Sequence, residues 1–209
     1  MRILIGFCVV ALLTDSLAAD EPVFSGPQAG EKLTPFRVQS VFGPSAGKEV
    51  ELIGELKGAP TVLVFVHEIT RPTLQLLRPI DRYGRKLAGD GLQTHFVWLT
   101  ADRARTEQFL TTASKSLALE SPVSMSVDGL EGPGNYGLNR KVTLTILVAR
   151  DNKVIANFAI VQPNETDGPK VLASVAKLMG KPAPTLNELK VGSEDRPEPT
   201  PNAELGLLM

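Results

Sequence analysis

The sequence predicts an α/β domain in which a mixed central β-sheet is flanked by helices. Two buried strands, over residues 61–66 and 92–99, are each followed by a helical pattern. Two further strands, over residues 142–149 and 154–160, flank a short polar turn. Strand–helix–strand units place strands in parallel, whereas a short polar turn joins antiparallel strands. The predicted sheet therefore contains both kinds of pairing.

The chain enters this sheet through a predicted N-terminal β-hairpin. Phe36–Val41 and Val50–Leu52 alternate between apolar and polar side chains, the period of a half-buried strand, on either side of a glycine-containing turn. Thr61–Val66 is instead a continuous run of apolar and β-branched residues. Such a run indicates a central strand that is covered on both faces.

Three helices are predicted around the sheet. Apolar side chains recur every three or four residues between Thr73 and Leu87, and Pro72 fits the first turn of that helix because no backbone N–H is needed there. A second helix is predicted over residues 102–119 and a last one over residues 169–180. The side chains expected to point inward from the second helix are Phe109, Leu110, Ala113 and Leu117.

The first 19 residues match a cleavable export signal. Arg2 supplies a positive charge, Ile3–Leu13 is an apolar run too short to span a bilayer, and small residues permit cleavage after Ala18 or Ala19. We therefore expect an exported protein, periplasmic or secreted, of bacterial origin, with no membrane span in the mature chain. That chain is expected to have three parts: an extended lead-in (20–34), one domain (35–180) and a disordered tail rich in proline and acidic residues (181–209).

Composition excludes several classes of chemistry. The only cysteine, Cys8, lies within the predicted signal, so the mature chain is expected to carry no thiol and no disulfide. A formal net charge of −1 offers no basic surface for nucleic acid. The two histidines lack the spacing of a metal site, and the glycine-rich stretch 129–137 lacks the Lys-Ser/Thr pair of a phosphate loop. No metal and no cofactor are expected.

Three segments carry a resemblance to a known family. Gly54–Pro60 leads into the first central strand, Tyr136-Gly137-Leu138 precedes the last pair of strands, and Ile146–Val154 forms their hairpin. In this order and spacing they resemble the thioredoxin-like superfamily, most closely its redoxin and peroxiredoxin branch, over residues 30–180. The resemblance implies a thioredoxin-like fold with its reactive site at the start of the helix that follows the first central strand.

The chain departs from that family at the positions that carry its chemistry. Where thioredoxins hold Cys-x-x-Cys, this sequence has Thr70-Arg71-Pro72-Thr73, and Thr73 stands where a peroxiredoxin holds its reactive thiol. A threonine hydroxyl stays protonated and cannot form a mixed disulfide, so thiol–disulfide oxidoreductase and peroxidase activities are not expected. The cis-proline of the family aligns with Val142, for which we predict a trans peptide bond.

Several further side chains are candidates for binding or catalysis. Arg71 is either a clamp for an anion or carboxylate at the helix N-terminus, or a solvated residue beside Thr70, which caps the helix. His67 and Glu68 are candidates for a general base or a metal ligand, but neighbouring residues of an extended chain point to opposite faces. Tyr136 borders the groove and is a further possible binding residue. His95 lies mid-strand and is interpreted as a packed side chain.

The sequence thus favours a non-catalytic thioredoxin-like module, a pseudo-enzyme that binds a protein partner or a small anionic ligand through the former active-site groove near Arg71. The alternative is a divergent enzyme that uses His67, Glu68 and Arg71 without thiol chemistry. Neither the partner nor the ligand is named by the sequence.

Overall fold

The computed structural model describes residues 23–185 and residue 188. The export signal predicted over residues 1–19 lies outside this part of the chain, as does the predicted tail beyond residue 185, apart from Glu188. Within the described residues, no helix has the length and apolar character that crossing a membrane requires.

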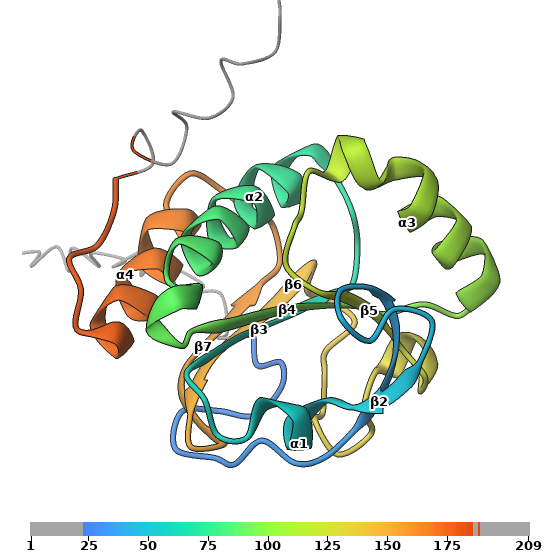
Figure 1. Ribbon diagram of the computed structural model, residues 1–209, viewed down its shortest axis with the longest axis horizontal. Coiled ribbons are helices and arrows are strands. Elements are labelled where there is room, and N and C mark those ends of the chain that lie inside the picture. The colour runs from blue at the N-terminus through green and yellow to red at the C-terminus, as the bar shows by residue number, and fades with distance from the viewer. Residues whose placement is uncertain (1–22, 186–187, 189–209) are drawn as a thin grey trace, which may run out of the picture.

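A seven-stranded sheet organises the described chain, with the strands in the order β2-β1-β5-β4-β3-β6-β7 (Figure 1). The strands are β1 (Arg37–Phe42), β2 (Glu49–Glu51), β3 (Thr61–Val66), β4 (Gln93–Trp98), β5 (Val123–Ser126), β6 (Leu144–Arg150) and β7 (Lys153–Ile160). The α-helices are α1 (Leu52–Leu56), α2 (Arg71–Lys86), α3 (Arg103–Leu117) and α4 (Asp167–Met179), and the 3₁₀ turns are η1 (Ala88–Asp90) and η2 (Gly129–Glu131).

The sheet is mixed, as the sequence predicts. β3, β4 and β5 run parallel to one another and are joined by α2 and α3, whereas β6 and β7 form an antiparallel hairpin beside β3. β1 pairs with β2 as the predicted N-terminal hairpin and also pairs antiparallel with β5. β3 therefore has a strand on each side, and all six of its residues are buried.

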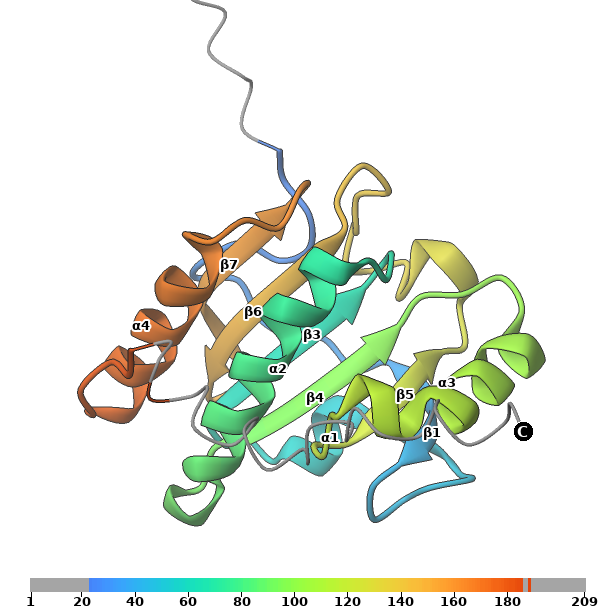
Figure 2. The same ribbon diagram turned by 90° about the horizontal axis from the view of Figure 1, so that it is seen from above.

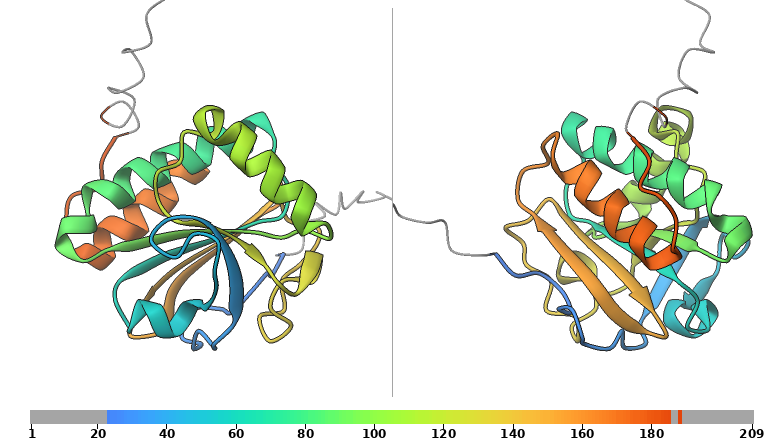
Figure 3. Two further views of the ribbon diagram at one scale, coloured as in Figure 1. Left: turned by 45° about the vertical axis from the view of Figure 1, so that its right-hand side comes forward. Right: turned by 90° about the vertical axis from the view of Figure 1, so that its left-hand side faces the viewer.

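The two faces of the sheet are covered differently. α2, α3 and α4 lie together on one face, with α2 between the other two (Figures 1 and 2). The short helix α1 lies on the opposite face, and β7 forms one edge of the sheet (Figure 3). Each face has its own apolar core: alternate residues of β3, such as Val64 and Phe65, pack into the helical core and into the core beneath α1, respectively.

Two elements and one side chain differ from the prediction. β5 was not predicted because its four residues, Val123–Ser126, alternate small hydroxyl and apolar side chains and are too few to show a period. The five-residue helix α1 occupies part of the segment that the sequence presents only as the lead into β3. Phe109 was expected to point inward, but its side chain is 43% exposed, whereas Leu110 and Leu117 of the same helix are buried.

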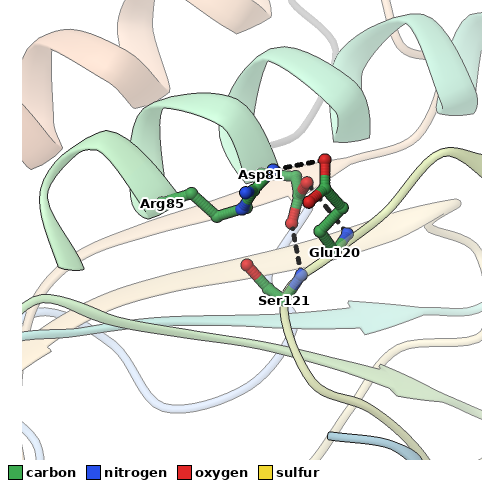
Figure 4. Close-up of polar contacts among 4 residues, drawn as sticks. All are labelled: Asp81, Arg85, Glu120 and Ser121. Atoms are coloured by element: carbon green, nitrogen blue, oxygen red, sulfur yellow. Dashed lines mark hydrogen bonds and ion pairs between the residues drawn. The ribbon is translucent and has the colours of Figure 1, made fainter.

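A buried carboxylate fixes α2 against the loop that precedes β5 (Figure 4). Asp81, in the third turn of α2, is 1% exposed, and its two oxygens accept hydrogen bonds from the backbone N–H of Glu120 (3.1 Å) and of Ser121 (2.9 Å). One turn later, Arg85 pairs with the carboxylate of Glu120 at the surface. The backbone of the loop entering β5 is thus held by the Asp81 carboxylate, and an apolar side chain at this position could not accept these hydrogen bonds.

Replacing Asp81 tests the contribution of this contact. We expect Asp81→Ala to lower the free energy of unfolding by about 2–4 kcal/mol, because two backbone N–H groups lose a charged acceptor in a buried site. Asp90→Ala is the control, since the Asp90 carboxylate pairs with Lys181 (3.2 Å) at the surface and such pairs contribute only about 0–1 kcal/mol. Urea unfolding followed by circular dichroism measures both. Equal effects of the two substitutions would contradict this role for Asp81.

Candidate functional site

The turn between β3 and α2 carries the residues that the sequence singles out. Thr70 has an extended backbone, and its Oγ1 accepts a hydrogen bond from the backbone N–H of Thr73 (3.2 Å), so Thr70 caps α2. Pro72 lies in the first turn of the helix, as predicted. This geometry satisfies one of the free N–H groups with which every helix begins.

The two hydroxyl groups of the Thr70–Thr73 tetrad point toward each other. Their Oγ1 atoms are 2.8 Å apart, and the Thr73 hydroxyl donates to the carbonyl of Glu68 (3.3 Å). Because the Thr73 hydroxyl donates its one proton to the Glu68 carbonyl, the Thr70 hydroxyl must be the donor in its bond to Thr73. Thr73 is fully buried. Both hydroxyls are therefore committed to the helix start, and the inner one is not accessible to solvent.

Arg71 follows the cap and is exposed. Among the described residues its guanidinium has no ion pair or hydrogen-bond partner, which agrees with a solvated residue and also leaves the charge available to a ligand. Glu68 is likewise exposed. Geometry alone leaves both interpretations of Arg71 open.

His67 is connected to the other face of the sheet and not to Glu68. Its Nε2 lies 3.0 Å from the Oγ1 of Thr145 on β6, and that hydroxyl lies 2.5 Å from the Oγ of Ser25 in the lead-in. Ser25 Oγ also accepts a hydrogen bond from the backbone N–H of Asn139 (2.9 Å). Burial lowers the pKa of His67 to about 4, so the ring is neutral at physiological pH.

The direction of this chain of hydrogen bonds follows from counting protons. If Ser25 donates to Thr145 and Thr145 donates to a neutral His67, every hydroxyl proton has an acceptor. The reverse direction would leave the Ser25 hydroxyl with no acceptor in the chain. Nε2 of His67 is therefore an acceptor, and the structure gives this histidine an anchoring contact in place of a partnership with Glu68.

Tyr136 is buried among aromatic side chains of the core beneath α1. Tyr136 is 3% exposed and packs edge-on against Phe36 and Phe65, with ring centroids 5.0 and 5.5 Å away. Burial, reinforced by the charge of Glu51, raises the pKa of Tyr136, and its hydroxyl donates to the carbonyl of Thr34 (3.0 Å). Tyr136 thus belongs to the core beneath α1 and offers no surface to a ligand.

Val142, at the position of the family's cis-proline, is 3% exposed. The described residues contain no cis peptide bond, so the bond between Lys141 and Val142 is trans, as predicted. The backbone N–H of Val142 donates to the carbonyl of Asn139 (3.2 Å), which closes a turn just before β6.

A cleft of about 370 Å³ lies beside the helix start, between the end of β3, the end of β4 and α3. Its lining combines an aromatic pair with charged groups: Val66, His67, Glu68, Ile69, Trp98, Arg105, Thr106 and Phe109. Sequence reasoning missed the contribution of α3 to this site. The one available signal was Phe109, which stands next to Leu110 and so cannot share its buried direction on a helix.

A metal centre is not supported by the described residues, which contain no group of three His, Cys, Asp or Glu side chains able to hold an ion. His95 lies on β4, where burial lowers its pKa to about 4.

Comparisons with known proteins rest on structure. No protein-family model matches the sequence, and no curated protein matches it. Solved structures that match include a putative thiol:disulfide interchange protein DsbE from Chlorobium tepidum (20% identity, TM-score 0.59), which covers 73% of this chain and 99% of its own. A putative protein disulfide isomerase from Bacteroides thetaiotaomicron matches at 14% identity and a TM-score of 0.59, over 76% of this chain and 96% of its own. The chain has a thioredoxin-like fold.

Peroxidoxin BcpB from Mycobacterium tuberculosis also matches, at 16% identity and a TM-score of 0.55, over 72% of this chain and 97% of its own. At these identities the matches establish the fold and nothing finer. They support the resemblance on which the tetrad Thr70–Thr73 was assigned to the redox positions of a thioredoxin-like chain. At the start of α2 the described chain has the hydroxyls of Thr70 and Thr73, and the one cysteine of the sequence, Cys8, lies outside the described residues.

Removing the cap hydroxyl should destabilise the thioredoxin-like domain. We expect Thr70→Ala to lower the free energy of unfolding by about 1 kcal/mol, since the N–H of Thr73 and the Thr73 hydroxyl both lose a partner. Arg71→Ala is the control, because Arg71 is exposed at the adjacent position and bonds no described residue. Thermal and urea unfolding measure the difference. A cost for Arg71→Ala equal to that for Thr70→Ala would show that the cap is not the relevant contact.

Proposed function

We propose that the protein is an exported thioredoxin-like binding module that performs no thiol chemistry. The observation that carries this proposal is the hydrogen bond between the Thr70 and Thr73 hydroxyls, 2.8 Å apart at the start of α2. A reactive group at this position would have to be free and activated by the helix N-terminus. Here both hydroxyls are used by the cap, and the inner one is buried.

Binding is supported by the cleft beside the helix start. Trp98 and Phe109 give it apolar walls, and the 43% exposure of Phe109 leaves an aromatic surface that the fold itself does not cover. Arg105 lines the same cleft, and its guanidinium bonds no described residue. Aromatic and arginine side chains dominate the energetics of protein recognition sites.

The occupant that fits this combination is a segment of a partner protein with an apolar side chain beside an acidic one. The apolar side chain would pack on Phe109, and the carboxylate would pair with Arg105, or with Arg71 at the helix start. A small anion alone would use the arginines but leave the aromatic wall exposed. The proposal therefore favours the protein partner over the small anionic ligand.

The enzyme alternative has no observation in its favour. It requires His67, Glu68 and Arg71 to act on one substrate. His67 is instead bonded to Thr145 on β6, while Glu68 and Arg71 face solvent.

Redox assays with a matched gain-of-function variant test the absence of thiol chemistry. We expect the chain of residues 20–209 to reduce insulin and consume peroxide no faster than buffer. The variant T70C/T73C should form an intramolecular disulfide and reduce insulin measurably, because the two side chains already point toward each other at a helix N-terminus, which favours the thiolate. T73C alone is the control for a single thiol. Appreciable turnover by the unsubstituted chain would end the proposal.

A photo-crosslinking amino acid placed at position 109 tests the binding role and export together. The full-length chain is expressed in the organism from which the sequence comes, and the protein is recovered from the exported fraction. Its intact mass should correspond to a chain beginning at Ala19 or Asp20. Irradiation should give one dominant protein adduct at position 109, and none from the same probe at position 170, an exposed site on α4.

Adding Arg105→Ala should reduce the adduct at least several-fold if the carboxylate pairs there. Adducts of equal yield at positions 109 and 170, or full yield with Arg105→Ala, would contradict the proposed surface. Recovery of the chain only from the cytoplasm would contradict export.

A further inference from the structure

The sheet has a notch at the start of β4. β5 begins at Val123, which pairs with Phe96, so no residue of β5 is paired with the three residues that precede Phe96 on β4. The backbone N–H of Gln93 donates toward β3, to the carbonyl of Pro60 (2.8 Å), and that of Phe96 donates toward β5, to the carbonyl of Pro122 (3.0 Å). Because these directions alternate along a parallel strand, the N–H and C=O of Thr94 face the notch.

A second cavity of about 370 Å³ occupies this region. Its walls come from the N-terminal hairpin, α1, the end of α2, β4 and the loop into β5. The lining residues are Ser40, Pro44, Ser45, Val50, Leu52, Glu55, Gly84, Arg85, Ala88, Leu92, Gln93, Thr94, His95, Glu120, Ser121, Pro122 and Ser124. The volume lies within the range of small-molecule sites.

Polar groups without protein partners converge on the cavity. Ser40 and Ser124 are register partners, and Ser124 is in turn paired with Val97, two residues from His95, so the three side chains share one face of the sheet. Ser40 and Ser124 are each only 4% exposed, yet neither hydroxyl is bonded to a described residue, and nor is the ring of His95. These polar groups line the cavity and are free to bond a molecule within it.

Thr94 adds a further unsatisfied hydroxyl on the opposite face. The residue is 6% exposed, and its Oγ1 has no hydrogen-bond partner. Gly84 of α2 packs directly over it, since a Cβ at position 84 would collide with that oxygen. The helix thus closes the cavity on this side.

The charged side chains around the cavity are one arginine and two glutamates. Among the described residues that line the cavity, Arg85 is the only Lys or Arg, and it pairs with Glu120 at the surface. Burial keeps His95 neutral at physiological pH by lowering its pKa to about 4. Glu55 adds a second carboxylate, so the lining has one more negative than positive charge. An anion would therefore find no partner here.

We propose that this cavity binds an uncharged, compact ring compound that carries a lactam or amide edge. An adjacent N–H and C=O on the ligand would pair with the C=O and N–H of Thr94, as a neighbouring strand would. Ser40, Ser124 and His95 would bond further polar atoms, and Val50, Leu52 and Leu92 would pack against the apolar body. The site lies at the opposite end of β4 from the cleft at Trp98, so it is independent of the proposed function.

The probe for this proposal is 2-quinolone, a neutral bicyclic lactam. Titration of the ¹⁵N-labelled chain of residues 20–209 should shift the backbone amides of Thr94, His95 and Ser124 saturably. N-methyl-2-quinolone lacks the lactam N–H and should bind roughly tenfold more weakly, because a buried acceptor is then left unpaired. Benzoate, which is similar in size but charged, should not saturate these shifts.

Variants separate binding from folding. Ala88→Trp places a large ring in the cavity from an exposed position of η1 and should abolish binding, whereas Ala173→Trp, at an exposed position of α4, should not. Ser124→Ala should weaken binding several-fold while leaving the urea midpoint unchanged, because its hydroxyl bonds no described residue. A purely structural hydroxyl would move the midpoint and not the affinity.

Three results would overturn the proposal. The first is the absence of saturable shifts at these amides with millimolar 2-quinolone, which would indicate a cavity that holds only water. The second is full binding by Ala88→Trp. The third is binding of benzoate as tight as that of 2-quinolone, which would contradict the uncharged ligand class.

Discussion

The structure depends on the burial of β3 between a parallel and an antiparallel neighbour. Thr61–Val66 bonds β4 on one side and β6 on the other, and its alternate side chains enter both cores. Because both edges and both faces of β3 are covered, the chain can reach the surface only before and after this strand. Its carboxyl end must therefore deliver residues 67–70 to the surface, where α2 starts. This topology places the N-terminus of α2 at the same point whether the first turn of the helix carries thiol or hydroxyl side chains.

Hydroxyls at that point change what the helix start does. In a thiol protein the helix N-terminus stabilises a charged nucleophile. Thr70 and Thr73 instead satisfy the N–H and C=O groups of the turn, and they bond each other. The two threonines thus stabilise the start of α2. In the proposed function, recognition falls to exposed side chains near the turn, such as Arg71, and to those that α3 supplies, such as Phe109.

The elements with a strong periodic signal could be predicted from the sequence, and contacts distant in sequence could not. β3 begins and ends at the predicted residues, and α4 ends at Gly180, whose positive φ (64°) closes the helix. β5 is too short and too rich in serine to show a period. The bond of His67 to Thr145, 78 residues away, has no local signature, so the anchoring role of His67 could not be read from its neighbours. The same holds for the notch beside β4, which exists only because β5 starts late.

The chain of hydrogen bonds from Ser25 through Thr145 to His67 has a consequence in acid. With a folded-state pKa of about 4 against an ordinary value of 6.5, His67 takes up its proton more readily in the unfolded chain. Its contribution to stability is therefore complete above pH 6.5 and declines as the solution is acidified toward pH 4. A protonated ring would donate where it now accepts, Thr145 would have to turn its hydroxyl toward Ser25, and the serine proton would lose its acceptor. Acid would thus weaken the contacts that hold the lead-in against the sheet.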